Sequence, residues 1–186
     1  LKGYFEVLSL KGVNSAGIHA DHGSIENFTV NLSNSDTDVL VKDTLAQTDS
    51  EVTIVAGTGS DDFNVGKADQ LDGITGHLII DAGTGYNTLA VNDGADSSDN
   101  NYTMINGLRD DFTTLREDSQ GDIHYRGSFA TADDSAGVVL QAGTGADRIR
   151  ISGIIDHART MILAGAGNDD ITIDLATYGV AGTLTV

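Results

Sequence analysis

The sequence predicts an all-β chain wound as a right-handed parallel β-helix, a β-solenoid with Gly-rich turns. A phrase of the form Ala-Gly-x-Gly-x-Asp/Asn, followed by alternating apolar residues, occurs four times, at 56–65, 82–91, 142–151 and 164–173. Such repetition is typical of solenoids. Alternation of apolar and polar residues dominates the chain, and helical periodicity is nearly absent. The 186 residues include 23 Gly and no Pro, which leaves every backbone N–H able to join a sheet ladder.

Each phrase follows a short apolar run, so each unit is predicted to be strand, turn and strand. The runs are Val52–Val55, Leu78–Ile80, Val138–Leu140 and Met161–Leu163. The first glycines of the phrases stand at 57, 83, 143 and 165, with intervals of 26, 60 and 22 residues. Intervals of 22 and 26 fit one turn of a β-helix. The interval of 60 predicts about two or three turns in which the phrase has decayed.

Further strands are predicted where apolar and polar residues alternate. These are Phe28–Leu32, Val39–Val41, Ile171–Ile173 and Leu184–Val186. The least regular stretch is 93–136, in which 93–101 is a polar loop that we expect to leave the coil. Residues 109–118 are compatible with a short helix or a strand. We predict a strand, because the equivalent region at 5–10 has strand composition.

A longer repeat of about 107 residues is superimposed on the short one. Segment 18–24 resembles 123–128, and segment 31–41 aligns with 141–151, which makes 32–41 a degenerate fifth copy of the phrase. We therefore expect 1–186 to form one continuous solenoid, about 1.7 copies of the unit (about 1–107 and 108–186). Neither end carries Pro, a Lys-rich stretch or a covering helix, the usual protections of a sheet edge. We expect copies to stack head to tail, or the chain to continue a longer array.

Composition limits the partners. The net charge of −18 argues against nucleic acid and anionic membrane surfaces, and it favours cations or basic partners. The absence of Cys excludes disulfides and thiolate metal sites. No apolar run approaches the length of a membrane helix, so no membrane insertion is predicted.

The acidic position of the phrase is the candidate metal site. Equivalent residues of successive coils stack about 4.8 Å apart, which predicts Asp61 beside Asn87 and Asp147 beside Asp169. Stacked carboxylates repel unless an amide or a cation lies between them. Ca²⁺ prefers six to eight oxygen ligands, which turn carbonyls and one Asp per coil would supply. The candidate Ca²⁺ ligands are Asp61, Asp147, Asp169 and Asp38. Turn formation without any metal is the alternative.

These phrases resemble the calcium-binding nonapeptide of RTX proteins, G-G-x-G-x-D-x-U-x. Agreement is good at 59–63, 145–149 and 167–171, whereas the first Gly is Ala in every copy and the copies are not in tandem. The long unit is similar to the RTX-like (haemolysin-type) β-helical repeats of very large bacterial surface proteins, comparing 165–173 and 71–78. The resemblance implies an extracellular or cell-surface location, a structural or adhesive role, and Ca²⁺ as a cofactor.

We therefore predict a non-enzymatic structural module of an extracellular fibre, surface layer or giant adhesin that stacks on itself. A Ca²⁺-triggered folding module is a related alternative. An alternative of another class is a β-helix lyase or hydrolase acting on acidic polysaccharide. It would need a groove that gathers Lys42, Lys67 and Arg109 with Asp61. Paired carboxylates occur at 61–62, 110–111, 133–134 and 169–170. Two of these pairs share one repeat position, which a structural role explains better, so no catalytic residue is predicted.

The histidines are predicted to have no metal role. His19, Asp21 and His22 form a compact set, but His124 takes the place of His19 in the second repeat without a counterpart of His22. A solvated or stacking histidine is expected at these positions. His77 and His157 are expected to be isolated.

Overall fold

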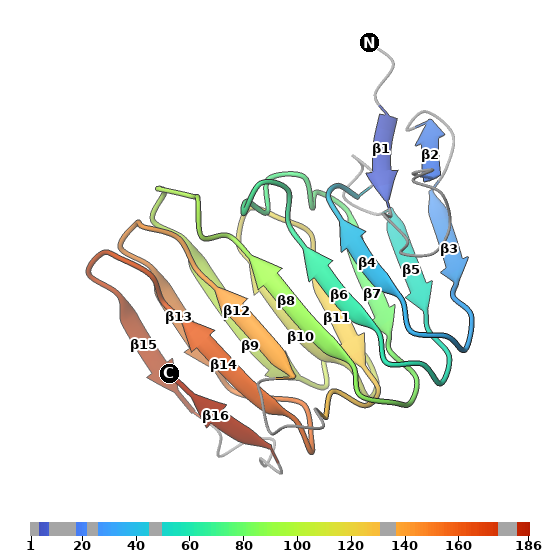
Figure 1. The fold of residues 1–186 in the computed structure, drawn as a ribbon. Coiled ribbons are helices and arrows are strands. Elements are labelled where there is room, and N and C mark those ends of the chain that lie inside the picture. Colours follow the sequence, from blue (N-terminus) through green and yellow to red (C-terminus); the bar gives the residue numbers. More distant parts are fainter. Residues whose placement is uncertain (1–3, 8–17, 22–25, 45–49, 131–136, 175–181) are drawn as a thin grey trace.

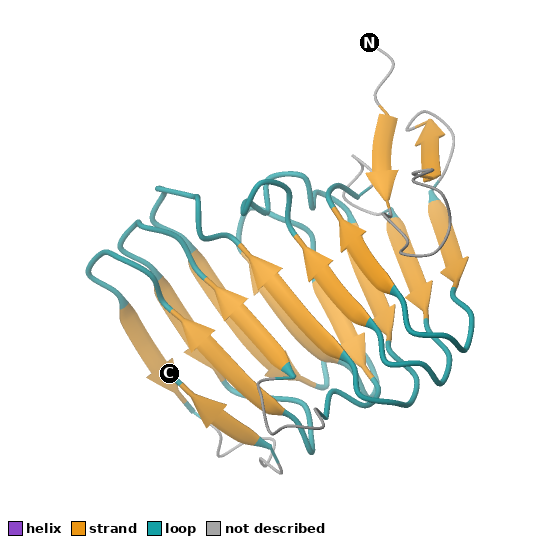
Figure 2. Cartoon of the chain, in the orientation of Figure 1, coloured by secondary structure: helices purple, strands orange, loops and turns teal. Residues whose placement is uncertain are grey.

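The structure is a computed structural model that describes residues 4–7, 18–21, 26–44, 50–130, 137–174 and 182–186. Every regular element in this part of the chain is a β-strand, and the strands form two eight-stranded sheets, A and B (Figures 1 and 2). The predicted all-β class is confirmed. Over the same residues, no helical segment has the length and apolarity needed to cross a membrane.

The strand order within each sheet gives the topology. Sheet A contains, in spatial order, β16 (Thr183–Thr185), β14 (Arg159–Leu163), β12 (Val138–Gln141), β8 (Thr88–Asn92), β6 (Asp62–Val65), β4 (Asp38–Val41), β1 (Tyr4–Val7) and β2 (Ile18–Asp21). Sheet B contains β15 (Asp170–Ile173), β13 (Arg148–Ile151), β9 (Asn101–Asn106), β10 (Thr113–Glu117), β11 (Ile123–Arg126), β7 (His77–Asp81), β5 (Glu51–Val55) and β3 (Asn27–Asn31).

The chain winds as a parallel solenoid of about five turns. It passes alternately from sheet B to sheet A, and each strand of a coil pairs in parallel with the equivalent strand of the next, as β3 with β5 and β4 with β6. In Figure 1 the front strands from β4 to β14 run upward, and the rear strands other than β10 run downward, while the chain advances from β3 to β15. This sense of winding is right-handed, as the sequence predicts.

The core lies between the two sheets and follows from the alternation. In β5, Val52 and Ile54 are fully buried, whereas Glu51, Thr53 and Val55 are partly exposed. The register places Val52 against Leu78 and Ile54 against Ile80. Equivalent apolar residues therefore stack along the axis into continuous columns that only inward-facing positions can join.

The 60-residue interval does not hold two or three decayed turns, and this prediction was wrong. It holds about one and a half turns, formed by β8, β11 and β12, together with the additional strands β9 and β10. β10 is antiparallel to both β9 and β11, and this meander lies in sheet B between β7 and β13. In sheet A, β8 pairs directly with β12. Sheet B is therefore two strands wider than sheet A at this level. The strand predicted for 109–118 is present as β10.

The strands that the long repeat relates lie in opposite sheets. β4 is in sheet A, whereas its counterpart β13 is in sheet B, and the same exchange relates β1 and β2 to β10 and β11. Both of these last pairs are antiparallel, with His19 opposite Glu6 and His124 opposite Thr114. An odd number of passages between the sheets separates the two copies. The Gly-rich turns of the second copy consequently lie at the opposite edge of the solenoid.

The glycines serve two purposes, of which the sequence indicated one. Gly83, Gly85, Gly165 and Gly167 have positive φ, as expected for sharp corners. At Gly59 a Cβ would lie 2.7 Å from the Ser35 carbonyl oxygen, and at Gly145 it would collide with that of Ser98. At these two positions glycine is required by the close stacking of coils.

Two buried tyrosines give a matched test of this core. The Tyr102 hydroxyl donates to Asp93 Oδ2 at 2.6 Å, whereas the Tyr125 hydroxyl has no hydrogen-bond partner among the described residues. We expect Tyr102→Phe to lower the free energy of unfolding by about 1–3 kcal/mol. Tyr125→Phe should leave it unchanged or raise it. Urea denaturation of both variants measures the difference, and equal losses would contradict this assignment.

Candidate functional site

The acidic positions of the phrases form two ladders, one at each edge of the solenoid. The first ladder is built on the turns 32–37, 56–61 and 82–87, which lead from sheet B to sheet A. The second is built on 93–100, 142–147 and 164–169, which lead from sheet A to sheet B. In both, a side-chain oxygen accepts a hydrogen bond from the backbone N–H at the equivalent place of the preceding coil. The predicted neighbours are confirmed: Asp61 N–H donates to Asn87 Oδ1 at 2.8 Å, and Asp147 N–H to Asp169 Oδ1 at 3.0 Å.

Asn87 shows what the first ladder requires of a side chain. Its amide is fully buried, and Nδ2 donates to the Ala82 carbonyl at 2.9 Å and the Ser128 carbonyl at 2.8 Å. With Oδ1 accepting from Asp61, the amide is paired on both sides. The environment at this point of the coil therefore presents carbonyl acceptors as well as a backbone donor.

Asp61 occupies the position of Asn87 in the preceding coil. When ionised, its carboxylate has no hydrogen to donate to the carbonyl acceptors at this position. It is fully buried, and neither carboxylate oxygen has a hydrogen-bond partner among the described residues. Desolvation raises the pKa of Asp61, and the nearby hydroxyl and amide of Thr37 offset this only in part. A buried carboxyl in such surroundings is stabilised by a proton or by a cation.

Asp147 occupies the corresponding position of the second ladder. Its Oδ1 accepts from Asn100 N–H at 2.9 Å, whereas its buried Oδ2 has no partner within the part of the chain that the structure describes. Desolvation raises the pKa of Asp147, and repulsion from Asp169 adds to the rise. Both ladders therefore hold one buried carboxyl with an unsatisfied oxygen.

The four candidate Ca²⁺ ligands do not meet in one site. Asp147 and Asp169 are adjacent, Asp61 lies at the opposite edge, and Asp38 begins β4. The register pairs Asp38 with Asp62, not with Asp61, because Thr37 takes the ladder position in that coil. Asp38 is therefore outside the ladder that contains Asp61.

A polar network beside the second ladder was not anticipated from the sequence. Asp93 is buried and accepts from the Leu71 N–H at 2.9 Å, from the Tyr102 hydroxyl, and from Asn100 Nδ2 at 3.4 Å. Desolvation raises the pKa of Asp93. Loop 93–101 therefore begins inside the coil, although we expected it to leave. The sequence did not indicate this burial, because a loop rich in Asp and Asn has the same composition whether it is solvated or forms a buried polar network.

The expectation that His77 is isolated was wrong. The ring centroids of His77 and His124 are 5.8 Å apart, and one ligand atom from each, with one from Asp122, lie within 4.8 Å of one another. Asp122 and His124 are two residues apart at β11 and share a face of the sheet, and parallel β7 brings His77 beside them. The Asp-x-His spacing was visible in the sequence, but the partner 45 residues away was not.

Loop 107–112 lies over this outer face of sheet B. Arg109 reaches Glu51, with Nη1 2.8 Å from Oε2, and Phe112 packs edge-on to His124 with ring centroids 6.5 Å apart. His124 is consequently only 6% exposed, and Ile79 beside it 4%. Burial lowers the pKa of His124 to about 4, so its imidazole is neutral at pH 7. His19 lies in β2, the side chains of which are outside the described residues, as is the whole of His22.

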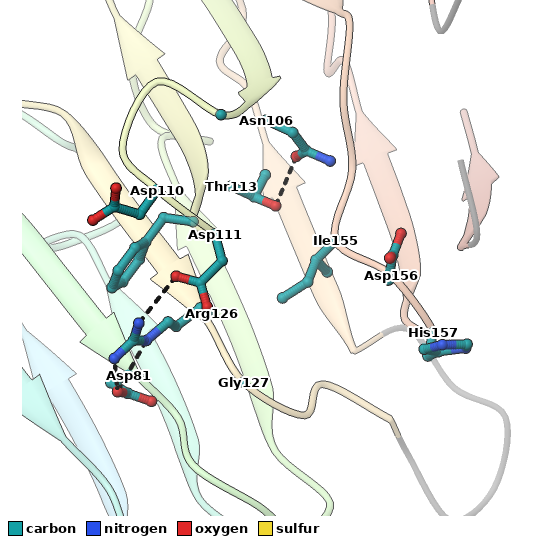
Figure 3. Close-up of a pocket in the computed structure, with 12 residues that line it drawn as sticks. Asp81, Asn106, Asp110, Asp111, Thr113, Arg126, Gly127, Ile155, Asp156 and His157 are labelled. Carbon is teal, nitrogen blue, oxygen red and sulfur yellow. Dashed lines mark hydrogen bonds and ion pairs between the residues drawn. The ribbon is translucent and has the colours of Figure 1, made fainter. Parts of the chain in front are cut away.

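An acidic cleft of about 740 Å³ opens where sheet B is wider than sheet A (Figure 3). One wall carries Asp110 and Asp111, and the other carries Asp156 and His157. Arg126 joins the first wall, with its guanidinium 2.7 Å from Asp81 and 3.0 Å from Asp111. The cleft exists because the segments that follow β11 and β13 are held apart by the two additional strands, β9 and β10.

The groups required by the polysaccharide-enzyme alternative are dispersed. Lys42 and Lys67 line a shallow hollow of about 450 Å³ on sheet A. Arg109 lies over sheet B, and Asp61 is buried at the edge. Of the paired carboxylates, 110–111 line the acidic cleft, and 133–134 lie outside the described residues. Within the part of the chain that the structure describes, the predicted groove is not assembled.

Comparison with known proteins gives no family: no family model, no curated protein and no solved structure matches this chain. The argument on function therefore depends on the geometry described above.

The buried carboxyls predict an unusual pH dependence. Because folding raises the pKa values of Asp61 and Asp147, the native state binds their protons more tightly than the unfolded state. Their contribution to stability should increase as the pH falls from 7 towards the ordinary carboxyl value of 3.8, and then level off. His124 acts oppositely, because its lowered pKa makes folding less favourable as the pH falls from 6.5 to about 4. Carboxyls whose pKa is lowered by folding, such as Asp96, stabilise the native state above pH 3.8, and this contribution is lost only as the pH falls below 3.8.

Asparagine variants isolate the carboxyl contribution from that of His124. We expect Asp61→Asn and Asp147→Asn each to raise the free energy of unfolding at pH 7 by about 1–3 kcal/mol, because they remove a buried charge and supply an N–H donor. The gain should shrink as the pH approaches 4. Asp62→Asn, at an exposed neighbour, is the control and should have little effect. A gain that is independent of pH would contradict the raised pKa values.

Proposed function

We propose that the chain is a structural repeat module of an extracellular fibre, surface layer or giant adhesin, which stacks head to tail on copies of itself. The observation that carries this proposal is the open end of the solenoid. From β8 and β9 onward the ladders are parallel as far as β15 and β16, whose outer edges pair with no other described strand. Unpaired strand edges are templates for further strands.

The burial of equivalent residues shows that the core is open at this end. The register relates Ile151 in β13 to Ile173 in β15, and both face inward. Ile151 is fully buried, whereas Ile173 is 50% exposed. At the other end, inward-facing Phe28 is only partly buried. A further coil placed on β15 would bury Ile173 as β15 itself buries Ile151.

The ladders support a cation-dependent form of this role. A net charge of −18 is concentrated in a narrow rod, and the second ladder stacks the carboxyls of Asp147 and Asp169 on each other. Ca²⁺ at the turn that holds Asp147 and Asp169 would offset repulsion and could satisfy the buried Oδ2 of Asp147. The similarity to RTX-like repeats agrees with this role and with a cell-surface location. The polysaccharide-enzyme alternative has less support, because its basic groups are dispersed.

A charge at the open end tests stacking. We expect Ile173→Glu to weaken association by roughly 10- to 100-fold, since each junction would lose the burial of one isoleucine. Thr172→Glu is the matched control, because residue 172 is adjacent but points outward opposite Arg150. Negative-stain electron microscopy in millimolar Ca²⁺ shows filament length, and analytical ultracentrifugation gives the association constant. Wild-type chains that stay monomeric at all concentrations would argue against self-stacking.

A second test concerns the ion. We expect Ca²⁺ to raise the thermal midpoint of the wild-type chain, and Asp147→Asn with Asp169→Asn to abolish that increase. Mg²⁺ at the same concentration is the control for general charge screening, because it binds reluctantly to sites that require dehydration. Equal stabilisation by both ions, or an undiminished effect in the double variant, would exclude Ca²⁺ at this turn.

A further inference from the structure

We propose that His77, Asp122 and His124 bind a divalent transition-metal ion of the Zn²⁺ class on the outer face of sheet B. This site is separate from the acidic ladders at the edges and does not depend on the proposed stacking function. Two imidazoles and one carboxylate, one ligand atom from each within 4.8 Å of the others, make a set that suits Zn²⁺ or Fe²⁺. Ca²⁺ prefers an all-oxygen set, so the same ion would not fill both places.

Strand geometry fixes the three side chains. Asp122 immediately precedes β11 and His124 lies within it, so the period of two puts both on one face. The register pairs His124 with Ile79 and Ile123 with Leu78, which sets His77 beside Asp122. The Asp122 N–H also donates to His77 Nδ1 at 3.3 Å. A site on adjacent, paired strands is held by the ladder itself and needs little rearrangement to accept an ion.

The Asp122 carboxylate keeps free acceptor positions although it is paired. Arg116 donates to Asp122 through two contacts of 2.8 Å. Two carboxylate oxygens offer about four lone-pair positions, so the guanidinium leaves capacity for an ion.

The surrounding groups orient the ligands as the outer shell of a metal site does. The Thr114 hydroxyl lies 2.9 Å from His124 Nδ1 and leaves Nε2 as the ligand atom. His77 differs, because its Nδ1 accepts from the Asp122 N–H at 3.3 Å and is therefore the unprotonated nitrogen of the neutral ring. An ion would be bound by His77 through Nδ1, in place of this long hydrogen bond. His124 has the second-nitrogen contact that is common in metal-binding imidazoles.

Loop 107–112 gives the cluster a cover on one side. Phe112 excludes water from His124, and Arg109 binds Glu51, which the register places opposite His77. Glu51 is therefore a further carboxylate beside His77. Three protein ligands leave coordination positions for water or for a fourth protein group.

Metal titration of the full chain tests the proposal. We expect the chain to bind one equivalent of Zn²⁺ by isothermal titration calorimetry, and Co²⁺ at the same site to give a visible absorption band. His77→Gln and His124→Gln should each abolish this one-to-one binding. Thr114→Val, which removes the hydroxyl that fixes His124, should weaken it by roughly 10- to 100-fold.

Two controls separate this cluster from other histidines. His157→Asn removes an exposed imidazole at the acidic cleft and should leave binding unchanged. The double variant His19→Gln, His22→Gln removes the other His-rich segment and should also leave binding unchanged. Circular dichroism verifies that each variant is folded. His77 is the more exposed ligand, so its variant remains informative if the buried His124 variant does not fold.

The outcomes are distinct. Loss of binding in the His77 and His124 variants alone supports the site. Absence of one-to-one binding in the wild-type chain would overturn it, as would binding that is lost only with His19 and His22. Paramagnetic broadening of the His77 and His124 imidazole NMR signals by Co²⁺ in the wild-type chain gives an independent assignment, and broadening confined to other histidines would also overturn the proposal.

Discussion

The parallel backbone ladder between successive coils is the constraint on which the rest of this molecule depends. It holds equivalent residues about one strand spacing apart, except in sheet B between β11 and β13, where β9 and β10 intervene. Apolar residues therefore stack on apolar residues, as Val52 does on Leu78. The same spacing leaves no room for a side chain where turns stack, which is why Gly59 and Gly145 face carbonyl oxygens of the preceding coil. It also stacks carboxyls, which is unfavourable for their charge.

Departures from the regular coil are where unusual chemistry gathers. The additional strands β9 and β10 widen sheet B, and the acidic cleft opens beside their connecting loop. The same loop folds over the outer face of sheet B, where His124 is buried beside Ile79. A single insertion in the solenoid thus accounts for both features.

Charge is arranged differently at the edges and on the face of the rod. At the edges, Asp61 and Asp147 are buried with unsatisfied oxygens, so their environment favours protons or a hard cation with oxygen ligands. On the face, Asp122 is kept ionised by Arg116 beside two histidines, a set that favours a softer ion. We infer that the stability of this acidic rod responds to ions through two separate structural elements. An extracellular setting, as proposed, would supply Ca²⁺ to the first.

The sequence by itself determined the class of the fold, the winding and most strands, because alternation and repeated glycine turns are local signals. It also paired Asp61 with Asn87 and Asp147 with Asp169, because those neighbours are one repeat apart. It could not show that the two pairs occupy opposite edges, because that depends on the number of passages between sheets across the irregular region. Nor could it join His77 to His124. Their contact arises only because β11 returns to β7 after a meander, and a register between strands 45 residues apart is fixed by packing of the whole sheet.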